Sequence, residues 1–227
     1  MTTAPDKQPR KNKGSSYSDL VCDHVRQSIL KGDLRPGDRL REKDLEKALG
    51  ISRTPIREAM KSLEAQGLIK MESWKGAFIA VLTRRQIIEL YDFRTMIEDF
   101  SVRMVCAQAS DQDIDRLDDI VSRSETLTSA SQSELVRLNS EFHAALTQFS
   151  RNRFVEEAIG PLRISFALMK GNAYGETGQW AQILREHRAI VDAIRARDAE
   201  RAAALVREHI FQSGVARLKR LQDADTL

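Results

Sequence analysis

The chain has 227 residues, of which 41% are hydrophobic and 30% are charged, a balance typical of a globular protein with a core of its own. This length suits two modest domains. No apolar run is long enough to cross a bilayer and the first residues lack the apolar core of a secretory signal, so we exclude an integral membrane protein and expect a cytoplasmic one. The two cysteines, Cys22 and Cys106, lie far apart inside apolar patterns, which favours a reducing compartment over a disulfide scaffold.

The net charge of +3 is unevenly distributed along the chain. Residues 1–83 hold 16 Lys or Arg against 11 Asp or Glu, whereas residues 84–227 hold the remaining 20 against 22. A basic N-terminal part and a slightly acidic C-terminal part are expected if only the N-terminal part binds a polyanion such as nucleic acid. The alternative is that the excess reflects residues 1–16, which are polar and aperiodic and which we expect to form a flexible basic tail.

The front of the chain shows the pattern of a small DNA-binding domain. Apolar spacing predicts helices over residues 17–31, 42–49 and about 53–66, and the two short β-type runs around residues 74–76 predict a hairpin. Three helices with a tight turn between the second and third, followed by a hairpin, form a winged helix-turn-helix. We therefore predict this domain over residues 17–82.

The third of these helices carries candidate DNA contacts. Arg53, Thr54 and Arg57 fall in one sector beside its apolar stripe, and the two arginines lie one turn apart at its N-terminal end. This end of a recognition helix enters the major groove and contacts base edges. The alternative is a solvated basic face on a small helical domain that meets no DNA.

From Thr83 onwards the pattern is helical almost to the end of the chain. We predict helices at about 84–108, 111–130, 133–150, 152–172, 178–197 and 198–221, with a clear loop over 171–178. Such helices pack as a bundle, and bundles commonly hold ligand sites in their cores. The expected fold is mainly α: the winged helix-turn-helix precedes an all-α bundle of six or seven helices over residues 83–222, and a short tail follows at 223–227.

Three of the four histidines lie on apolar faces of three different predicted helices in this region, namely His143, His187 and His209. Three imidazoles on inward faces can converge on one metal ion. Asn139, one helical turn before His143, would add an oxygen ligand. The alternative for each histidine is a hydrogen-bonded place in the core.

Two parts of the chain resemble known families. The segments GDLRPGDRL, LEKALGISRTPIREAMKSLEAQGLI and KGAFIAV resemble the GntR family of bacterial transcription regulators, with SRTPIREA as the most specific signal. The segments YDFRTMIE, LNSEFHAAL and EHRAIVDAIRARDAERAAALVREHI resemble the FCD effector domain of its FadR-like subfamily. These resemblances imply a homodimeric transcription regulator that binds an inverted-repeat operator in double-stranded DNA and a small effector in its helical domain.

The resemblance also implies roles for residues of the DNA-binding domain. By match to the family motif, Arg53, Thr54 and Arg57 would contact DNA, and Lys43 stands at a position that is usually basic. Gly76 would lie at the tip of the wing and let the backbone approach DNA closely. Lys75 would add attraction to phosphates without sequence information.

A divalent metal site is a further implication of the resemblance. Many FCD domains carry an Asp- or Asn-x3-His pair and two later histidines, which Asn139, His143, His187 and His209 match here. We expect zinc, with nickel or manganese as alternatives. Asn in place of the more usual Asp removes a negative charge, which leaves occupancy and metal identity open and favours an anionic guest.

Arg94, in YDFRTMIE, matches the arginine with which similar regulators hold an effector carboxylate, a contact that suits its planar guanidinium. The alternative is an ion pair with Glu98, four residues later. We expect a small organic acid to bridge Arg94 and the metal. Its binding would shift the population of arrangements of the two DNA-binding domains through the linker near residues 81–85, and we expect a repressor.

Two other functions remain open. In a metal sensor the ion itself would be the signal, without an organic effector. A metal-dependent hydrolase would need a carboxylate as general base, but none is clearly paired with the histidines, and the HExxH and nucleophile-elbow patterns are absent. We therefore expect a regulator that is not an enzyme.

Overall fold

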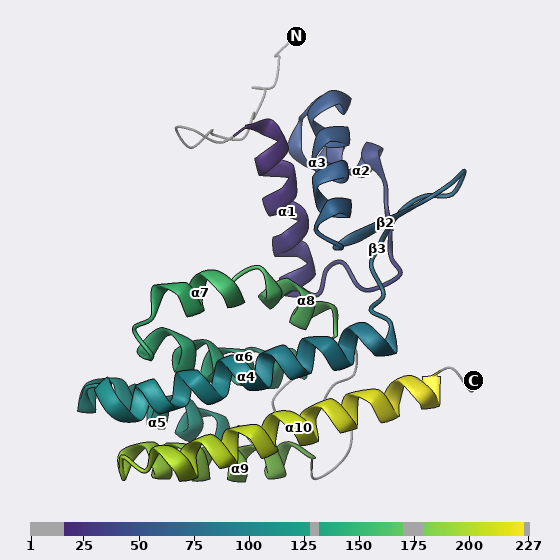
Figure 1. Cartoon of the computed structure of the whole chain (residues 1–227). Helices are drawn as coiled ribbons and strands as arrows, with labels where there is room; N and C mark the ends of the chain where they lie inside the picture. The colour runs from purple at the N-terminus through teal and green to yellow at the C-terminus, as the bar shows by residue number, and fades with distance from the viewer. Residues whose placement is uncertain (1–15, 128–131, 170–178, 225–227) are drawn as a thin grey trace. The chain divides into compact units, whose positions relative to one another are not determined.

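The computed structural model describes residues 16–127, 132–169 and 179–224, which Figure 1 draws as coloured ribbon. They form two compact units: the residues up to Val81 together with the segment from Arg163, and the remaining helices. The predicted tails over 1–16 and 223–227 lie largely outside the described residues, and the predicted loop over 171–178 lies wholly outside them.

The first unit holds α1 (Tyr17–Lys31), α2 (Glu42–Leu49) and α3 (Arg53–Ala65), as the apolar spacing predicted. Helices α1 and α3 pack together because each turns its apolar stripe inward. Helix α2 ends at Gly50, whose φ of 65° lies in the left-handed region that glycine adopts without strain. The chain can therefore turn sharply into α3, as a helix-turn-helix requires.

A small antiparallel sheet completes this fold, with its strands in the order β1 (Arg39–Leu40), β3 (Gly76–Ile79), β2 (Ile69–Glu72). Strands β2 and β3 form the predicted hairpin, which extends away from α3 in Figure 1. Strand β1 was not among the predicted elements. Two residues are too few for an alternating pattern, yet pairing with β3 buries Leu40.

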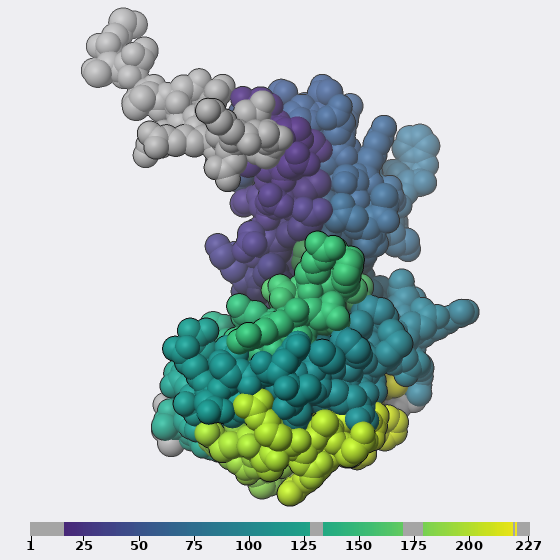
Figure 2. All heavy atoms as spheres, turned by 60° about the vertical axis from the view of Figure 1, so that its left-hand side comes forward, coloured from purple at the N-terminus to yellow at the C-terminus, as the bar shows by residue number. Residues whose placement is uncertain are grey.

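The second unit is helical, and the bounds of α4 match the predicted helix over 84–108. Thr83 and Ser110 each form a reciprocal capping box at a helix start. Helices α4 and α10 run along each other, and the yellow C-terminal helix lies at the surface beside the teal residues in Figure 2. The helices of this unit are α4 (Arg84–Gln108), α5 (Asp111–Glu125), α6 (Gln132–Phe149), α7 (Arg153–Ile159), α9 (Gln179–Arg195) and α10 (Ala199–Ala224).

Two helix predictions need correction. The single helix expected over 152–172 is interrupted: α7 ends at Ile159 and α8 (Leu162–Leu168) begins after Gly160 and Pro161. Proline has no N–H to continue the ladder and its ring clashes with the preceding turn. The helix expected over 111–130 ends earlier, since α5 stops at Glu125.

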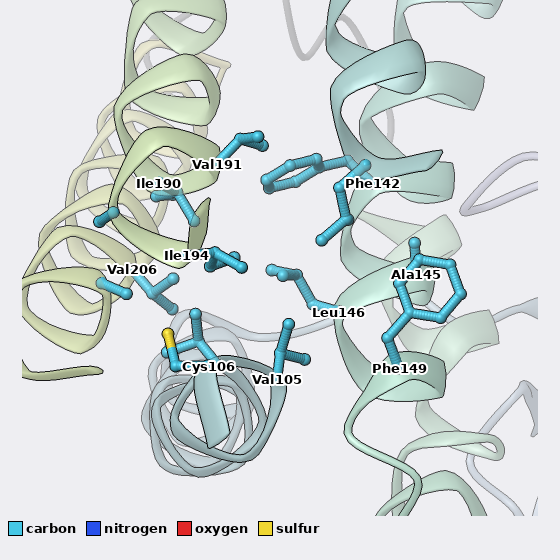
Figure 3. Close-up of a cluster of buried hydrophobic side chains, with 14 of the residues drawn as sticks. Val105, Cys106, Phe142, Ala145, Leu146, Phe149, Ile190, Val191, Ile194 and Val206 are labelled. Carbon is cyan, nitrogen blue, oxygen red and sulfur yellow. The ribbon is translucent and has the colours of Figure 1, made fainter. Parts of the chain in front are cut away.

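The core of the second unit consists mainly of aliphatic and aromatic side chains from α4, α5, α6, α9 and α10, and Figure 3 shows part of it. Phe142, Leu146 and Ile194 lie at its centre and are fully buried. The predicted mainly α fold, with a winged helix-turn-helix ahead of a helical region, is confirmed. Among the described helices, none combines the length and the apolar character that a membrane span requires.

Candidate metal centre and DNA-contacting surface

Three buried histidines converge in the second unit. His143 comes from α6, His187 from α9 and His209 from α10. The Nε2 atom of His209 lies 3.3 Å from Nε2 of His187 and 3.3 Å from Nε2 of His143. One ring nitrogen of each residue lies within 4.8 Å of those of the other two. The three side chains that the sequence predicted to face inward therefore meet at one point.

Two carboxylates orient these rings from outside the cluster. Nδ1 of His143 lies 2.6 Å from Oε2 of Glu98, and Nδ1 of His209 lies 2.6 Å from Oε2 of Glu186. Burial opposes the ionisation of Glu98, but the Arg94 guanidinium and His143 outweigh it and lower the pKa of this carboxyl to about 2. A carboxylate only accepts hydrogen bonds, so each Nδ1 donates its proton and each Nε2 presents a lone pair to the cluster.

Two of the imidazoles, those of His143 and His187, are held in the form that binds metals. Burial, with the positive charge of Arg94 beside it, lowers the pKa of His143 to about 4, and burial also lowers the pKa of His187 well below its usual range. A neutral imidazole is the ligand form. The lone pairs on Nε2 of His143 and His209 face each other, an arrangement that is repulsive unless a cation lies between them.

The donor set fits a divalent metal. Zinc binds imidazole nitrogen at about 2.0–2.1 Å, and two ligands of a tetrahedron at that distance are about 3.3 Å apart. The two measured Nε2–Nε2 distances of 3.3 Å agree with this spacing. Asn139 is half-buried on α6, one turn before His143, and its role as a fourth ligand stays a prediction.

Arg94 lies beside the cluster on α4. Its Nε donates to Oε1 of Glu98 at 2.6 Å, while the other oxygen of Glu98 accepts from His143. The ion pair weighed as an alternative for Arg94 is thus present, and it is well shielded: the Arg94 side chain is 11% exposed and that of Glu98 is 1% exposed. The contact of Arg94 with an effector carboxylate stays a prediction. Glu98 links this guanidinium directly to a histidine of the cluster.

We expected no carboxylate to be clearly paired with the histidines as a general base, and the structure shows two carboxylates, Glu98 and Glu186, that do contact them. Glu186 precedes His187 in sequence but pairs with His209, because neighbouring residues on a helix point in different directions. A sequence signal for Glu98 did exist, since it lies on the same face of α4 as the buried Val102 and Val105. Because both carboxylates contact the nitrogens that point away from the cluster, they position the rings.

On the first unit, the two arginines predicted to contact DNA lie in the N-terminal part of α3 and pair with glutamates of α2. Arg53 Nε donates to Glu46 Oε1 at 2.8 Å, and Arg57 Nε donates to Glu42 Oε1 at 3.0 Å. Both arginine side chains remain largely exposed. The two arginines were predicted from the sequence but their glutamate partners were not, because these pairs follow from the packing of α2 against α3.

The other predicted DNA contacts of this unit are also at the surface. Thr54 and Lys43 are exposed on α3 and α2, respectively. Gly76, the first residue of β3, has a φ of 100°, and the turn of the wing before it consists of residues 73–75. Lys75 is exposed in this turn, with Nζ 3.7 Å from Oε2 of Glu72. Their contacts with DNA stay predictions.

Two family models match the chain. Residues 18–79 match the bacterial regulatory proteins of the gntR family, and residues 89–212 match the FCD domain. The HTH-type transcriptional regulator YdhC of Bacillus subtilis is 31% identical over 200 residues, which are 87% of this chain and 89% of that protein. The Nta operon transcriptional regulator of Aminobacter aminovorans is 35% identical over 135 residues, 59% of this chain and 64% of that protein.

Solved structures share the fold. McbR/YncC of E. coli has a TM-score of 0.76 at 21% identity and covers 92% of this chain and 99% of its own. A GntR transcriptional regulator from Rhodococcus sp. RHA1 has a TM-score of 0.77 at 24% identity, with 90% of this chain and 99% of its own covered. At these sequence identities, both structures show that this chain shares their fold.

Proposed function

Since this chain belongs to the GntR family of bacterial regulatory proteins and carries an FCD domain, we propose that it is a repressor controlled by a small organic acid at a metal centre. The family and the named relatives make it a DNA-binding transcription regulator and not an enzyme. The control mechanism rests on one observation, the convergence of His143, His187 and His209 on a common point inside the second unit.

In the proposed centre the three histidines hold a zinc ion, or nickel or manganese in its place, with Asn139 as an oxygen ligand. The bound ion supplies positive charge to which a carboxylate is attracted. Arg94 offers the acid a second contact, a planar fork suited to a carboxylate. Glu98 keeps this guanidinium and the His143 ring in fixed positions, so that both contacts are preorganised.

The DNA side of the mechanism uses the first unit of each chain in a homodimer. Helix α3 enters the major groove, where Arg53, Thr54 and Arg57 contact base edges, while Lys43 and Lys75 contact phosphates. Binding of the acid shifts the population of arrangements of the two DNA-binding units, through the linker near residues 81–85, away from the one that matches an inverted repeat. Repression then ends because the operator is released.

The test of the metal centre is a native mass spectrum of the protein purified without added metal or ligand. We expect a dimer heavier than its sequence mass by about one divalent ion per chain, an excess that His187→Ala abolishes. His24→Ala is the matched control, because His24 belongs to α1 in the other unit. Equal metal content in the wild type and in His187→Ala would refute the centre.

Two further measurements separate the effector from the metal. A panel of small carboxylic acids is added to the metal-loaded protein on operator DNA, and the acid that releases the DNA is then tested against Arg94→Ala. An unchanged response would refute the role of Arg94. If chelation alone abolishes DNA binding at physiological salt and no acid affects it, the ion is the signal, which is the metal-sensor alternative.

A further inference from the structure

Trp74 lies in the turn that joins the two strands of the wing. The strands pair as far as Glu72 and Gly76, so residues 73–75 form the connection. The indole side chain is fully exposed, at 103% of its reference area. A large aromatic ring that gives up no surface to its own protein is a candidate contact with a partner.

The backbone conformation at Trp74 also indicates a functional position. Its φ of 67° is left-handed, a conformation that is strained for a bulky residue. In the described part of the chain, Arg151 and Arg197 are the other non-glycine residues with positive φ. Both use their side chains to join neighbouring elements: Arg151 pairs with Asp113 at 2.7 Å, and Arg197 donates to the carbonyl of Ala109 at 2.7 Å.

At Trp74 the side chain gives no such compensation within the chain, because the ring is fully exposed. Glycine would adopt this backbone without strain. A tryptophan here therefore costs stability in the free protein and must be explained by something that the ring contacts. Strained residues of this kind are found at functional positions.

The charges around the wing indicate the nature of that partner. The exposed Lys70 and Lys75 place their Nζ atoms 3.4 and 3.7 Å from carboxylate oxygens of Glu72. Arg39 of the neighbouring strand lies beside Gly76, since a Cβ at this glycine would be 3.6 Å from its Nη2. Besides Glu72, the wing contacts the carboxylate of Glu64, which accepts from the N–H of Met71. Three cations against two carboxylates leave the wing with a small excess of positive charge.

We propose that Trp74 contacts duplex DNA, with its indole packed against sugars and base edges in the minor groove beside the major groove that receives α3. The proposal rests on the DNA-binding role of the first unit. Apolar side chains inserted in the minor groove and aromatic rings packed on bases add affinity through non-ionic contacts. Trp74 therefore supplies affinity that differs in kind from that of the phosphate-contacting lysines.

Salt dependence distinguishes the two kinds of contact. The probe is a duplex recovered by the wild-type protein from a random library. We expect Trp74→Ala to weaken binding about 10- to 100-fold with an unchanged slope of log K against log salt. Lys75→Ala, the matched control, should lower that slope by about one. A Trp74→Ala variant that binds like the wild type would overturn the proposal.

Two more variants separate the contact from folding. Trp74→Gly relieves the left-handed strain, so we expect its thermal midpoint to be equal or higher while its DNA affinity falls as in Trp74→Ala. Trp74→Phe keeps an aromatic ring and should recover part of the affinity. Loss of affinity in Trp74→Ala but not in Trp74→Gly would mean that the tryptophan acts through the fold, and this would overturn the proposal.

The indole can also be observed directly. The chain has two tryptophans, so Trp180→Phe leaves Trp74 as the only one. We expect the duplex to change the fluorescence of Trp74 and to protect it from acrylamide. A change of Trp74 fluorescence with anionic vesicles but not with the duplex would mean that the ring contacts membranes, and this would overturn the proposal.

If Arg57→Ala no longer binds the duplex, but Trp74→Ala binds it normally and the duplex leaves the fluorescence of Trp74 unchanged, the proposal for Trp74 fails and the DNA-binding role of α3 stands. If neither Arg57→Ala nor Trp74→Ala weakens binding of the duplex, the proposed DNA-binding surface itself is wrong.

Discussion

At the residue scale, Glu98 connects the proposed effector contact to the proposed metal ligands. One of its oxygens accepts from Arg94 and the other from His143, both at 2.6 Å. It is buried, and the two neighbours keep it ionised. A ligand that changes the position of Arg94 therefore acts on His143 through a single side chain.

We predict that Glu98→Gln lowers zinc affinity about 10- to 100-fold, because the amide no longer provides the negative charge that fixes the tautomer and orientation of His143. Competition with a chelating dye measures this. Glu89→Gln is the matched control, since Glu89 is an exposed residue on the same helix that pairs with Arg85. Unchanged affinity in Glu98→Gln would show that His143 needs no carboxylate.

Arg57 carries the corresponding prediction for DNA. Arg57→Ala should cost about 1–3 kcal/mol of operator binding and relax the base preference at one operator position. Binding to a set of single-base operator variants measures both effects. A uniform loss over all variants would make Arg57 a phosphate contact instead.

The residues of the candidate metal site were predictable to different degrees. The inward direction of His143, His187 and His209 follows from local helical spacing, so the sequence was sufficient to predict it. The pairing of Glu186 with His209 is a contact between two helices, 23 positions apart in sequence, and local spacing carries no information about it. The same holds for the pairs that Glu42 and Glu46 form with Arg57 and Arg53, respectively.

At the element scale, the start of α5 combines a capping box with a contact from a distant segment. Asp113 accepts from Ser110 and, at 2.7 Å, from Arg151. The Ser110 hydroxyl is the main cause, and Arg151 a further one, of a pKa of Asp113 below its usual 3.8. A carboxyl with a lowered folded-state pKa stabilises the fold above its unfolded pKa, and this contribution is lost as the pH falls through the lowered value.

We therefore predict that Asp113→Asn lowers the free energy of unfolding by about 1 kcal/mol at pH 7 and that the difference shrinks in acid. Urea unfolding followed at several pH values measures it. Gln86→Ala is the control, because the capping box of α4 contains a neutral glutamine and should show a cost independent of pH. A pH-independent cost for Asp113→Asn would contradict the argument.

The elements themselves were predicted well where a cap and a regular apolar spacing coincided, as in α4, which runs from the cap at Thr83 to Gln108. The prediction failed where apolar spacing continued through a break. It joined α7 and α8 into one helix although Pro161 lies between them. It also missed β1, whose existence depends on the partner strand β3 and not on its own two residues.

At the scale of the whole molecule, the proposed dimer recognises two half-sites at once. Two linked units bind with an affinity that depends on the geometry between the half-sites. We predict that inserting about 5 base pairs, half a helical turn, between them reduces affinity to that of a single half-site, and that inserting about 10 restores part of it. Mobility-shift titrations measure this, and equal affinity for all spacings would mean that the units bind independently.

The pairs Arg53–Glu46 and Arg57–Glu42 also bear on how the regulator searches a chromosome. Each arginine is already satisfied by a carboxylate, so a random stretch of DNA, which offers mainly phosphates, gains little by displacing that carboxylate. A matching site places guanine edges where these arginines can reach them, and there the exchange is expected to be favourable. We therefore expect brief stays on unrelated sequence and long ones at the target, because α2 sets a threshold that only a correct match exceeds.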